Sequence, residues 1–267
     1  MILAAIFDRV NAEASFIHIL KWAFVFMAKK PTTQPASMPQ HVAIIMDGNR
    51  RWARQHGLEA SLGHQKMVDD GIEEVVKAAK KLGIKYLTLW ALSTENWNRD
   101  PKEIQFLMKL FRQVFGNQAK KLHEEGVKIQ AIGDLSRFDQ DIQDKIAKWV
   151  KETEQNTEIT VVFALNYGGR DEVLRAVEKI GRAIKQGKLP AKKLTAKQFT
   201  QYLDTAALPD PDLIVRAGGE RRLSGFLLWQ NNYSELYFTD VLMPDFNGEQ
   251  LEKAVKDFNQ RKRNFGK

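Results

Sequence analysis

Short apolar runs alternate with longer amphipathic runs between residues 41 and 262. The apolar runs are continuous rather than alternating, which is typical of strands buried on both faces of a parallel sheet. They predict six strands, at residues 41–46, 86–93, 127–134, 159–167, 212–219 and 235–242. Helical periodicity predicts helices near residues 64–82, 102–125, 139–155, 170–186, 195–204 and 248–262. This alternation predicts an α/β fold: a single domain with a mostly parallel six-stranded sheet flanked by helices.

The start of the chain has a different pattern. Residues 14–28 (ASFIHILKWAFVFMA) are almost wholly apolar, yet they fall short of the roughly 20 residues that a membrane-spanning helix needs. They also lack the charge order and cleavage site of a signal peptide. Two interpretations remain: a helix lying on a membrane surface, or translation that starts at Met27 or Met38. We predict an N-terminal extension over 1–38, an apolar segment plus a flexible linker, and a folded domain over 39–267.

Charge and cysteine usage narrow the choice of partners and compartment. The formal net charge is +8, which suits anionic partners such as nucleic acid, a membrane surface or phosphorylated small molecules. Plain solubility explains much of the charge equally well, because many lysines lie on predicted helix faces. The 267 residues include no cysteine, which excludes disulfides and cysteine-bound zinc. We predict a cytoplasmic protein, with membrane association through the N-terminal segment as an addition.

Polar segments, three of them with glycine, follow four of the six predicted strands. They read DGNRRW after the first strand, STENWNR after the second, NYGGR after the fourth and RAGGERRLS after the fifth. In open parallel sheets, ligands bind outside the carboxyl ends of the strands. Each segment by itself is a weak signal, but together they predict one polar site at this edge.

The first of these segments combines groups suited to a phosphate and its metal. Gly48 permits a sharp turn and a close approach to a ligand, and a helix that begins here directs free N–H groups toward an anion. Arg50 and Arg51 add bidentate donors. The carboxylate of Asp47 would repel an anion unless a Mg²⁺ ion lay between them. The alternative is that Asp47 only caps the helix.

A second anion site is predicted in the segment from Arg216 to Ser224. It again contains a glycine turn, several guanidinium groups and a hydroxyl, so two sites at one edge indicate two phosphorylated substrates. Neither a GxxxxGK[ST] loop nor a GxGxxG fingerprint is present. His64 either donates to a phosphate or caps a helix. The acidic run Asp69, Asp70 and Glu73 lies on a predicted helix and is interpreted as a solvated face.

These motifs together resemble one known family. HVAIIMDGN-x-RWA, GH, STENWNR, NYGGR, RAGGE-x-R-x-S and LLWQ-x-x-Y-x-ELYF occur in order over about residues 39–266. They are similar to the motifs of the cis-prenyltransferases, and most of all to bacterial undecaprenyl diphosphate synthases. The resemblance implies that 39–267 is a catalytic domain that condenses isopentenyl diphosphate repeatedly with an allylic diphosphate, usually farnesyl diphosphate. The product would be a long-chain Z-polyprenyl diphosphate, in particular the undecaprenyl diphosphate used as cell-wall carrier lipid.

The resemblance also implies a cofactor, partners and residue roles. Mg²⁺ would be the cofactor, the protein would be a homodimer with peripheral membrane contact for product release, and nucleic acid would not be a partner. Asp47 would serve catalysis and the metal, Asn96 would accept a proton, and Glu235 would be a second metal ligand contributed across the dimer. The implied substrate-binding residues are Gly48, Asn49, Arg50, Arg51, Trp52, His64, Ser93, Thr94, Glu95, Trp97, Arg99, Arg216, Arg222, Leu223 and Ser224.

The growing chain would need an apolar tunnel between the sheet and the helices around 86–115. Candidate lining residues are the small Ala91 and the apolar set Phe106, Leu107, Leu110, Phe111 and Phe115, although ordinary core packing explains the same pattern. Three positions depart from the family. Ala60 stands where a basic residue is usual, Met67 where glycine is usual, and Asn264 within the usual C-terminal RxG.

Three other functions fit parts of the sequence. A short- or medium-chain Z-prenyl diphosphate synthase shares every motif and differs only in the depth of the tunnel. A non-catalytic partner subunit of a heteromeric prenyltransferase lacks the aspartate of the DGN motif, so Asp47 argues against it. Nucleic-acid binding rests on the net charge alone.

Overall fold

The structure is a computed structural model that describes residues 38–190 and 193–262. The described residues all fall within one compact unit, Met38–Lys267. The predicted N-terminal extension lies outside the described residues apart from Met38, and so does Asn264.

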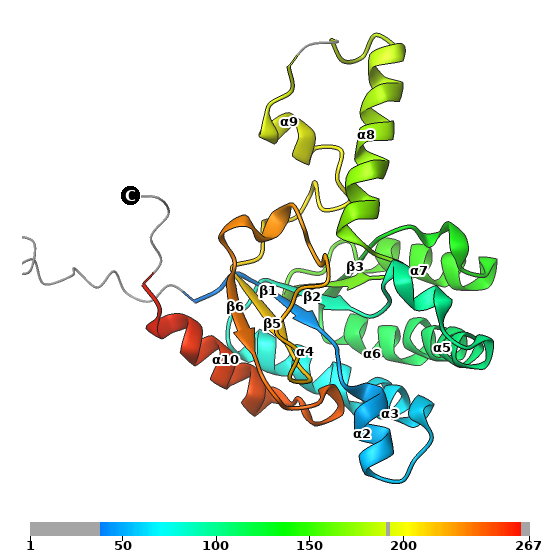
Figure 1. Ribbon diagram of the computed structural model, residues 1–267, viewed down its shortest axis with the longest axis vertical. Helices are drawn as coiled ribbons and strands as arrows, with labels where there is room; N and C mark the ends of the chain where they lie inside the picture. Colours follow the sequence, from blue (N-terminus) through cyan, green and yellow to red (C-terminus); the bar gives the residue numbers. More distant parts are fainter. Residues whose placement is uncertain (1–37, 191–192, 263–267) are drawn as a thin grey trace, which may run out of the picture. The chain divides into compact units, whose positions relative to one another are not determined.

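Six parallel strands form one sheet with the order β3-β4-β2-β1-β5-β6 (Figure 1). Each neighbouring pair is parallel, which confirms the predicted fold class. Every strand ends before the predicted run does, because the last residues of each run turn away into the loops at the carboxyl edge. The strands are β1 (His41–Ile45), β2 (Tyr86–Trp90), β3 (Val127–Ile132), β4 (Ile159–Ala164), β5 (Leu213–Arg216) and β6 (Glu235–Phe238).

The helices follow the predicted periodicity. They are α2 (Asn49–Gln55), α3 (Ala60–Lys66), α4 (Ile72–Lys81), α5 (Pro101–Gln113), α6 (Ala119–Glu124), α7 (Gln140–Glu152), α8 (Gly169–Lys185), α9 (Ala196–Thr200) and α10 (Gly248–Gln260). Of these, α5, α9 and α10 begin at side-chain caps. Asp100 accepts a hydrogen bond from the Lys102 amide with Pro101 in the first turn, and Thr195 forms a capping box with Gln198.

Two apolar clusters cover the two faces of the sheet. The larger cluster joins side chains such as Ile44, Leu89 and Phe163 to the apolar faces of α4, α5, α6, α7 and α10. The smaller cluster joins Ala43, Ile45 and neighbouring strand residues to a loop around Phe226. Successive strand residues therefore alternate between two buried faces, which explains why the strands are continuously apolar in sequence.

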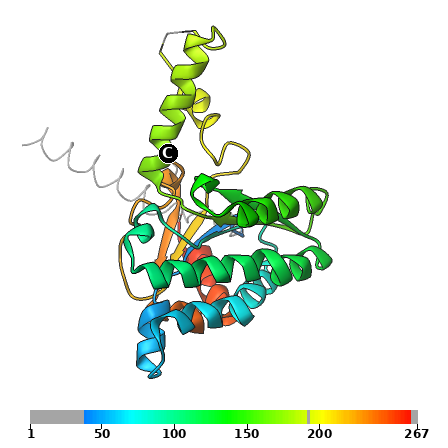
Figure 2. The ribbon, with the colours of Figure 1, turned by 90° about the vertical axis from the view of Figure 1, so that its right-hand side faces the viewer.

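Helix α8 extends away from the sheet, with α9 beside it, as Figures 1 and 2 both show. The side chains of Leu174 and Val177 on this helix are 64% and 53% exposed. No helix among the described residues is long and apolar enough to cross a bilayer.

Two of the predicted helices are not continuous. Residues 64–82 are interrupted by a π-helical turn, η1 (Met67–Gly71), in which the Ile72 amide donates to the Met67 carbonyl. Residues 102–125 are interrupted by a second π-turn, η3 (Val114–Gln118), closed by the Ala119 amide and the Val114 carbonyl. Such wide turns insert one extra residue into a helix and are frequent at functional sites. Periodicity over a long window does not detect them, because the apolar pattern on either side stays helical.

Candidate active site

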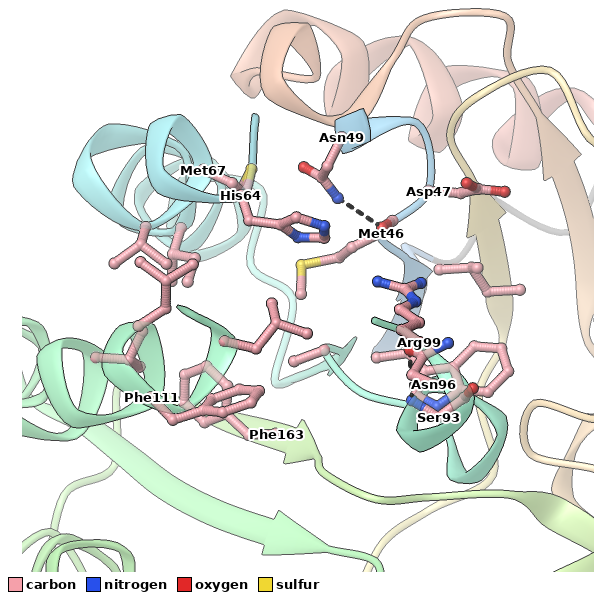
Figure 3. A pocket seen from close by; sticks show the side chains of 18 of the residues that line it. Met46, Asp47, Asn49, His64, Met67, Ser93, Asn96, Arg99, Phe111 and Phe163 are labelled. Carbon is pink, nitrogen blue, oxygen red and sulfur yellow. Dashed lines mark hydrogen bonds between the residues drawn. The ribbon is translucent and has the colours of Figure 1, made fainter. Parts of the chain in front are cut away.

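A cavity of about 330 Å³ lies at the carboxyl ends of β1, β2 and β5. One end of it is polar, with Asp47, Asn49, His64 and Arg216 among its lining residues. The other end is apolar and is formed by helix side chains, including Leu107 and Phe111 (Figure 3). The cavity therefore has the shape and polarity for a ligand with an anionic head and an apolar tail.

Asp47 follows β1 directly and is held by several groups. Its Oδ2 accepts a hydrogen bond from Arg216 Nη2 at 2.8 Å, and its Oδ1 accepts one from the Gly48 amide at 2.6 Å. Arg51 Nη2 lies 3.6 Å from the same Oδ1. Among the described residues that line the cavity, Asp47 supplies the one carboxylate.

Two glycines allow the polar end to form. Gly48 has a φ of +100°, which favours glycine, and this turn starts α2 immediately after the strand. A Cβ on Gly63 would lie 2.0 Å from the Asn49 carbonyl oxygen, so α3 approaches α2 this closely only because residue 63 has no side chain. The approach brings His64 beside Asn49.

Asn49 and His64 each present an unpaired polar atom in this region. Asn49 Nδ2 donates to the Met46 carbonyl at 3.0 Å, whereas its buried Oδ1 and the buried Nε2 of His64 have no protein partner. Buried polar atoms without partners are rare and costly in native proteins. Their presence here is consistent with a polar ligand that supplies the missing hydrogen-bond partners.

His64 is surrounded by cationic groups. Burial, followed by the nearby charges of Arg99 and Arg50, lowers the pKa of His64 from 6.5 to about 4. Both arginines interact with Glu103, Arg99 Nη1 at 2.9 Å from Oε1 and Arg50 Nη1 at 3.8 Å from Oε2. A bound anion would stabilise the protonated imidazole and reverse this pKa shift.

Arg216 anchors the segment that follows β5. Its side chain is buried; Nη1 donates to Ser224 Oγ at 3.1 Å and to the Arg222 carbonyl. A Cβ on Gly218 would lie 2.8 Å from Arg51 Nη2 and 3.1 Å from the backbone of Asp47. This glycine, with a φ of +88°, therefore brings the loop after β5 against the loop after β1.

A second, more basic hollow of about 330 Å³ adjoins the cavity and shares five lining residues with it. Its lining includes four arginines and Asp47 as the one carboxylate of the described residues there. The arginines are Arg50, Arg51, Arg54 and Arg99. Guanidinium groups converging on one hollow bind phosphate or diphosphate oxygens with several charge-assisted hydrogen bonds.

Sequence and structure comparisons agree with this chemistry. The family model described as "Putative undecaprenyl diphosphate synthase" matches residues 45–266. The chain belongs to the undecaprenyl diphosphate synthase family. An isoprenyl transferase of Clostridium perfringens is 47% identical over 86% of this chain and 90% of its own length. A farnesyl-diphosphate-specific ditrans,polycis-undecaprenyl-diphosphate synthase of Pasteurella multocida is 46% identical over 87% of this chain and 96% of its own.

Two solved structures of the family share the fold. Lavandulyl diphosphate synthase from Lavandula x intermedia, in complex with dimethylallyl diphosphate, superposes with a TM-score of 0.83 at 38% identity, covering 86% of this chain and 99% of that chain. A probable undecaprenyl diphosphate synthase from Campylobacter jejuni superposes with a TM-score of 0.68 at 34% identity, covering 86% of this chain and 100% of that chain. The predicted prenyltransferase family is thus confirmed.

Most of the substrate-binding residues predicted from this family resemblance converge on the two hollows. The structure brings together Asp47, Gly48, Asn49, Arg50, Arg51, His64, Ser93, Asn96, Arg99, Arg216, Arg222 and Ser224. Trp52, Thr94, Glu95, Trp97 and Leu223 do not line either hollow.

Those five residues have other contacts or are exposed. Trp52 stacks on His56 and donates to Asp245, while Glu95 is exposed. Trp97 donates to Asn166 and packs against Phe138. Thr94 contacts Gly168, and Leu223 packs against the smaller core cluster. Their substrate-binding roles in this family member stay predictions.

The side chain of Asn96 caps a short helix in this structure. It lies on η2 (Thr94–Asn98), and its Oδ1 accepts a hydrogen bond from the Ser93 amide at 3.1 Å, which forms a capping box. The oxygen that would receive a proton is therefore already engaged. The role of Asn96 as a proton acceptor stays a prediction.

Glu235 and Asp47 lie at opposite ends of the sheet. Glu235 is the first residue of β6 and is in register with Leu213, the first residue of β5. It pairs with Arg261 Nη1 at 3.0 Å. Within the part of the chain that the structure describes, no group of three or more His, Asp or Glu side chains could hold a metal. One chain therefore does not bring the two predicted metal ligands together.

The apolar end agrees in part with the predicted tunnel. Ala91, Leu107, Leu110 and Phe111 line the cavity. Phe115 is instead fully buried against Phe163, and Phe106 packs on the larger core cluster. Asp69 and Asp70 are exposed, as expected for a solvated helix face, whereas Glu73 is half-buried.

Two features of the site were not predicted from the sequence: Glu103 and the part played by the first π-turn. Glu103 follows Arg99 by four residues at the start of a helix, a spacing typical of an ion pair, so this signal was available. Val68 and Ile72 also line the cavity. Nothing in their local sequence distinguishes them from ordinary core residues.

Proposed function

We propose that this chain elongates an allylic diphosphate, initially farnesyl diphosphate, by repeated condensation with isopentenyl diphosphate. Each cycle breaks the bond between the allylic carbon and its diphosphate, forms a carbon–carbon bond and releases a proton, leaving a new Z double bond. The product would be a long-chain polyprenyl diphosphate, undecaprenyl diphosphate in the first instance. The observation that carries this proposal is that the arginine-lined hollow shares five lining residues with a cavity whose other end is apolar.

The two diphosphates would occupy different parts of the polar end. Arg50, Arg51 and His64 would bind the allylic diphosphate, since they surround the basic hollow. Arg222 and Ser224, in the loop after β5, would bind isopentenyl diphosphate. The buried Arg216 lies between them through its contacts with Asp47 and Ser224, so it would orient both sites.

Mg²⁺ fits the residues around Asp47. Proteins bind this ion through one or two carboxylates together with substrate phosphate oxygens, and Asp47 supplies one carboxylate beside the arginines. The ion would stabilise the charge of the departing diphosphate. Asp47 would hold the ion, and Arg216, which donates to its Oδ2, would orient the carboxylate.

A homodimer is part of the proposal. The exposed Leu174 and Val177 on α8 provide an apolar surface that a second copy would cover. Glu235, at the far end of the sheet from Asp47, would then act as a metal ligand toward the partner subunit. We further propose a cytoplasmic enzyme that contacts the membrane peripherally, since a long prenyl product partitions into lipid.

A product assay tests the proposal. The purified protein is incubated with farnesyl diphosphate, labelled isopentenyl diphosphate and Mg²⁺, and the lipids are sized by mass spectrometry. A ladder of polyprenyl diphosphates is expected, and its loss with EDTA would support the metal. Absence of any condensation product with several allylic starters would refute the proposed activity. A short single product would refute the undecaprenyl assignment alone.

A further inference from the structure

Gly71 occupies a position where the backbone does not require glycine. Its φ and ψ are −68° and −38°, ordinary helical values that alanine adopts at lower conformational cost. What its missing side chain provides is space. A Cβ at this position would lie 2.5 Å from Met67 Sδ and 2.6 Å from Met67 Cε. The side chain of Met67 therefore lies directly over Gly71.

Met67 is also part of the cavity wall. It is 4% exposed and lines the cavity with Val68 and Ile72 from the same turn. Figure 3 shows it beside His64, on the wall across from Phe111. The volume open to an apolar tail thus depends on where this flexible thioether side chain lies.

The two π-turns are connected, which limits how the wall can relax. Asp69 Oδ1 accepts hydrogen bonds from Gln65 Nε2 at 2.7 Å and from Gln113 Nε2 at 2.9 Å. Gln118 Nε2 donates to the Asp69 carbonyl at 3.3 Å. Because η1 is tied in this way to α5 and η3, a side chain added at Gly71 would displace Met67 rather than the backbone. The empty space beside Met67 is the cavity.

We propose that Met67 and Gly71 form a specificity-determining pair, in which Met67 folded over Gly71 sets the length of prenyl chain that the cavity accepts. This inference rests on the proposed function and adds the residues that would limit its product. Gly71→Ala should push Met67 into the cavity and shorten the product by about one five-carbon unit, because packed walls respond to changes of a single methylene. Met67→Ala should open the wall and lengthen the product.

The double variant M67A/G71A separates this mechanism from general damage to the helix. Without the Met67 side chain, the alanine at position 71 has nothing to displace, so the double variant should match M67A. Gly116→Ala is the matched control: Gly116 lies in the other π-turn, and a Cβ there meets no atom within 4 Å. Its product distribution should equal that of the wild type. Circular dichroism and thermal unfolding of all four variants exclude misfolding as the cause.

Products are sized by mass spectrometry, and binding of n-alkyl phosphates from decyl to octadecyl is measured by calorimetry. G71A should lose affinity only for the longer probes, and M67A should gain it. If the wild type makes a ladder while G71A and M67A leave both product length and probe selectivity unchanged, the pair has no such role. If no chain forms but the probe selectivity shifts as expected, the proposed condensation fails and the steric role of the pair stands.

Discussion

The two ends of the cavity are built in different ways. At the polar end, loops after β1 and β5 hold individual atoms in place, such as the Asp47 carboxylate between Arg216 and the Gly48 amide. At the apolar end, α5 and the first π-turn present side chains whose shared property is volume, such as Leu107 and Met67. Substitutions at the polar end should therefore change rate or affinity for diphosphates. Substitutions at the apolar end should change which chain lengths are accepted.

The largest effect is expected for Asp47→Ala. It removes the one carboxylate among the described lining residues, so turnover should fall by about 10³-fold or more, as when a key group that stabilises the transition state is deleted. The fold should remain, with a circular dichroism spectrum like that of the wild type. Asp70→Ala, which removes an exposed carboxylate near the apolar end, is the matched control and should retain activity. Full activity in Asp47→Ala would overturn the metal assignment.

Gly218→Ala tests how closely the loops after β1 and β5 must approach. The new Cβ would meet Arg51 and the Asp47 backbone at a φ of +88°, so the free energy of unfolding should fall by about 1–3 kcal/mol, with lower kcat/KM. Gly57→Ala is the control, because Gly57 has a φ of +67° but no atom within 4 Å of its Cβ position. It should lose stability and keep its activity. Equal loss of activity in both variants would mean that strain, not contact with Asp47, is responsible.

Acid should destabilise the fold through His41 at the other end of β1. The Nδ1–H group donates to the Pro209 carbonyl and Nε2 accepts from Thr88, while burial lowers the pKa of His41 from 6.5 to about 4. Because the folded pKa is the lower one, the unfolded chain takes up the proton first. The stability is complete above pH 6.5 and is lost as the pH falls toward 4, by about 2 kcal/mol between pH 7 and 5.

Chemical unfolding at several pH values measures this. His41→Gln should remove the contribution of His41 and leave that of His64, whose pKa is lowered to the same value. NMR titration then contrasts His41 with His64, whose pKa is also about 4. Inorganic diphosphate should raise the pKa of His64 and leave that of His41 unchanged, since His64 lines the basic hollow. An equal shift at both histidines would argue against a diphosphate site beside His64.

A smaller effect is expected for Ala60→Arg. Residue 60 lies four positions before His64 on α3, so the two share a helix face. A guanidinium there should lower the KM of the allylic diphosphate about tenfold, the scale of one charge-assisted hydrogen bond. Leu62→Arg adds the same charge at an exposed position two residues before His64, on a different face of α3, and should have a weaker effect. Equal changes in KM would indicate a general charge effect rather than a specific contact.

Much of the architecture and of the polar end could be predicted from local patterns. The run HVAIIM predicts a strand buried on both faces, and β1 is buried along its whole length. Glycine and arginine after several strands predict convergence at one edge, because parallel strands end at the same side of a sheet. Family motifs then assigned roles to residues such as His64, which the structure places beside the basic hollow.

Contacts between elements could not be predicted in this way. Trp97 looks like a substrate-loop residue in sequence, but in the structure it packs against Phe138. Asn96 looks available for catalysis, but its side-chain oxygen caps η2. The contact of Trp97 depends on a neighbour far away in the chain. The partner of Asn96, Ser93, is only three residues away, and there the rotamer of the side chain decides. Neither a distant neighbour nor a rotamer is encoded in the spacing of residues along one segment.

The sequence by itself determined the order of strands and helices, the edge that carries the chemistry and the residue types found there, because backbone hydrogen bonding and burial impose short periods on the chain. The tertiary structure decided the volume of the apolar end of the cavity at that edge. The contact of Met67 with Gly71, and the hydrogen bonds that join the two π-turns, exist only once separate helices have packed. The volume of the cavity depends on how several elements pack together, so the sequence of a single element does not predict it.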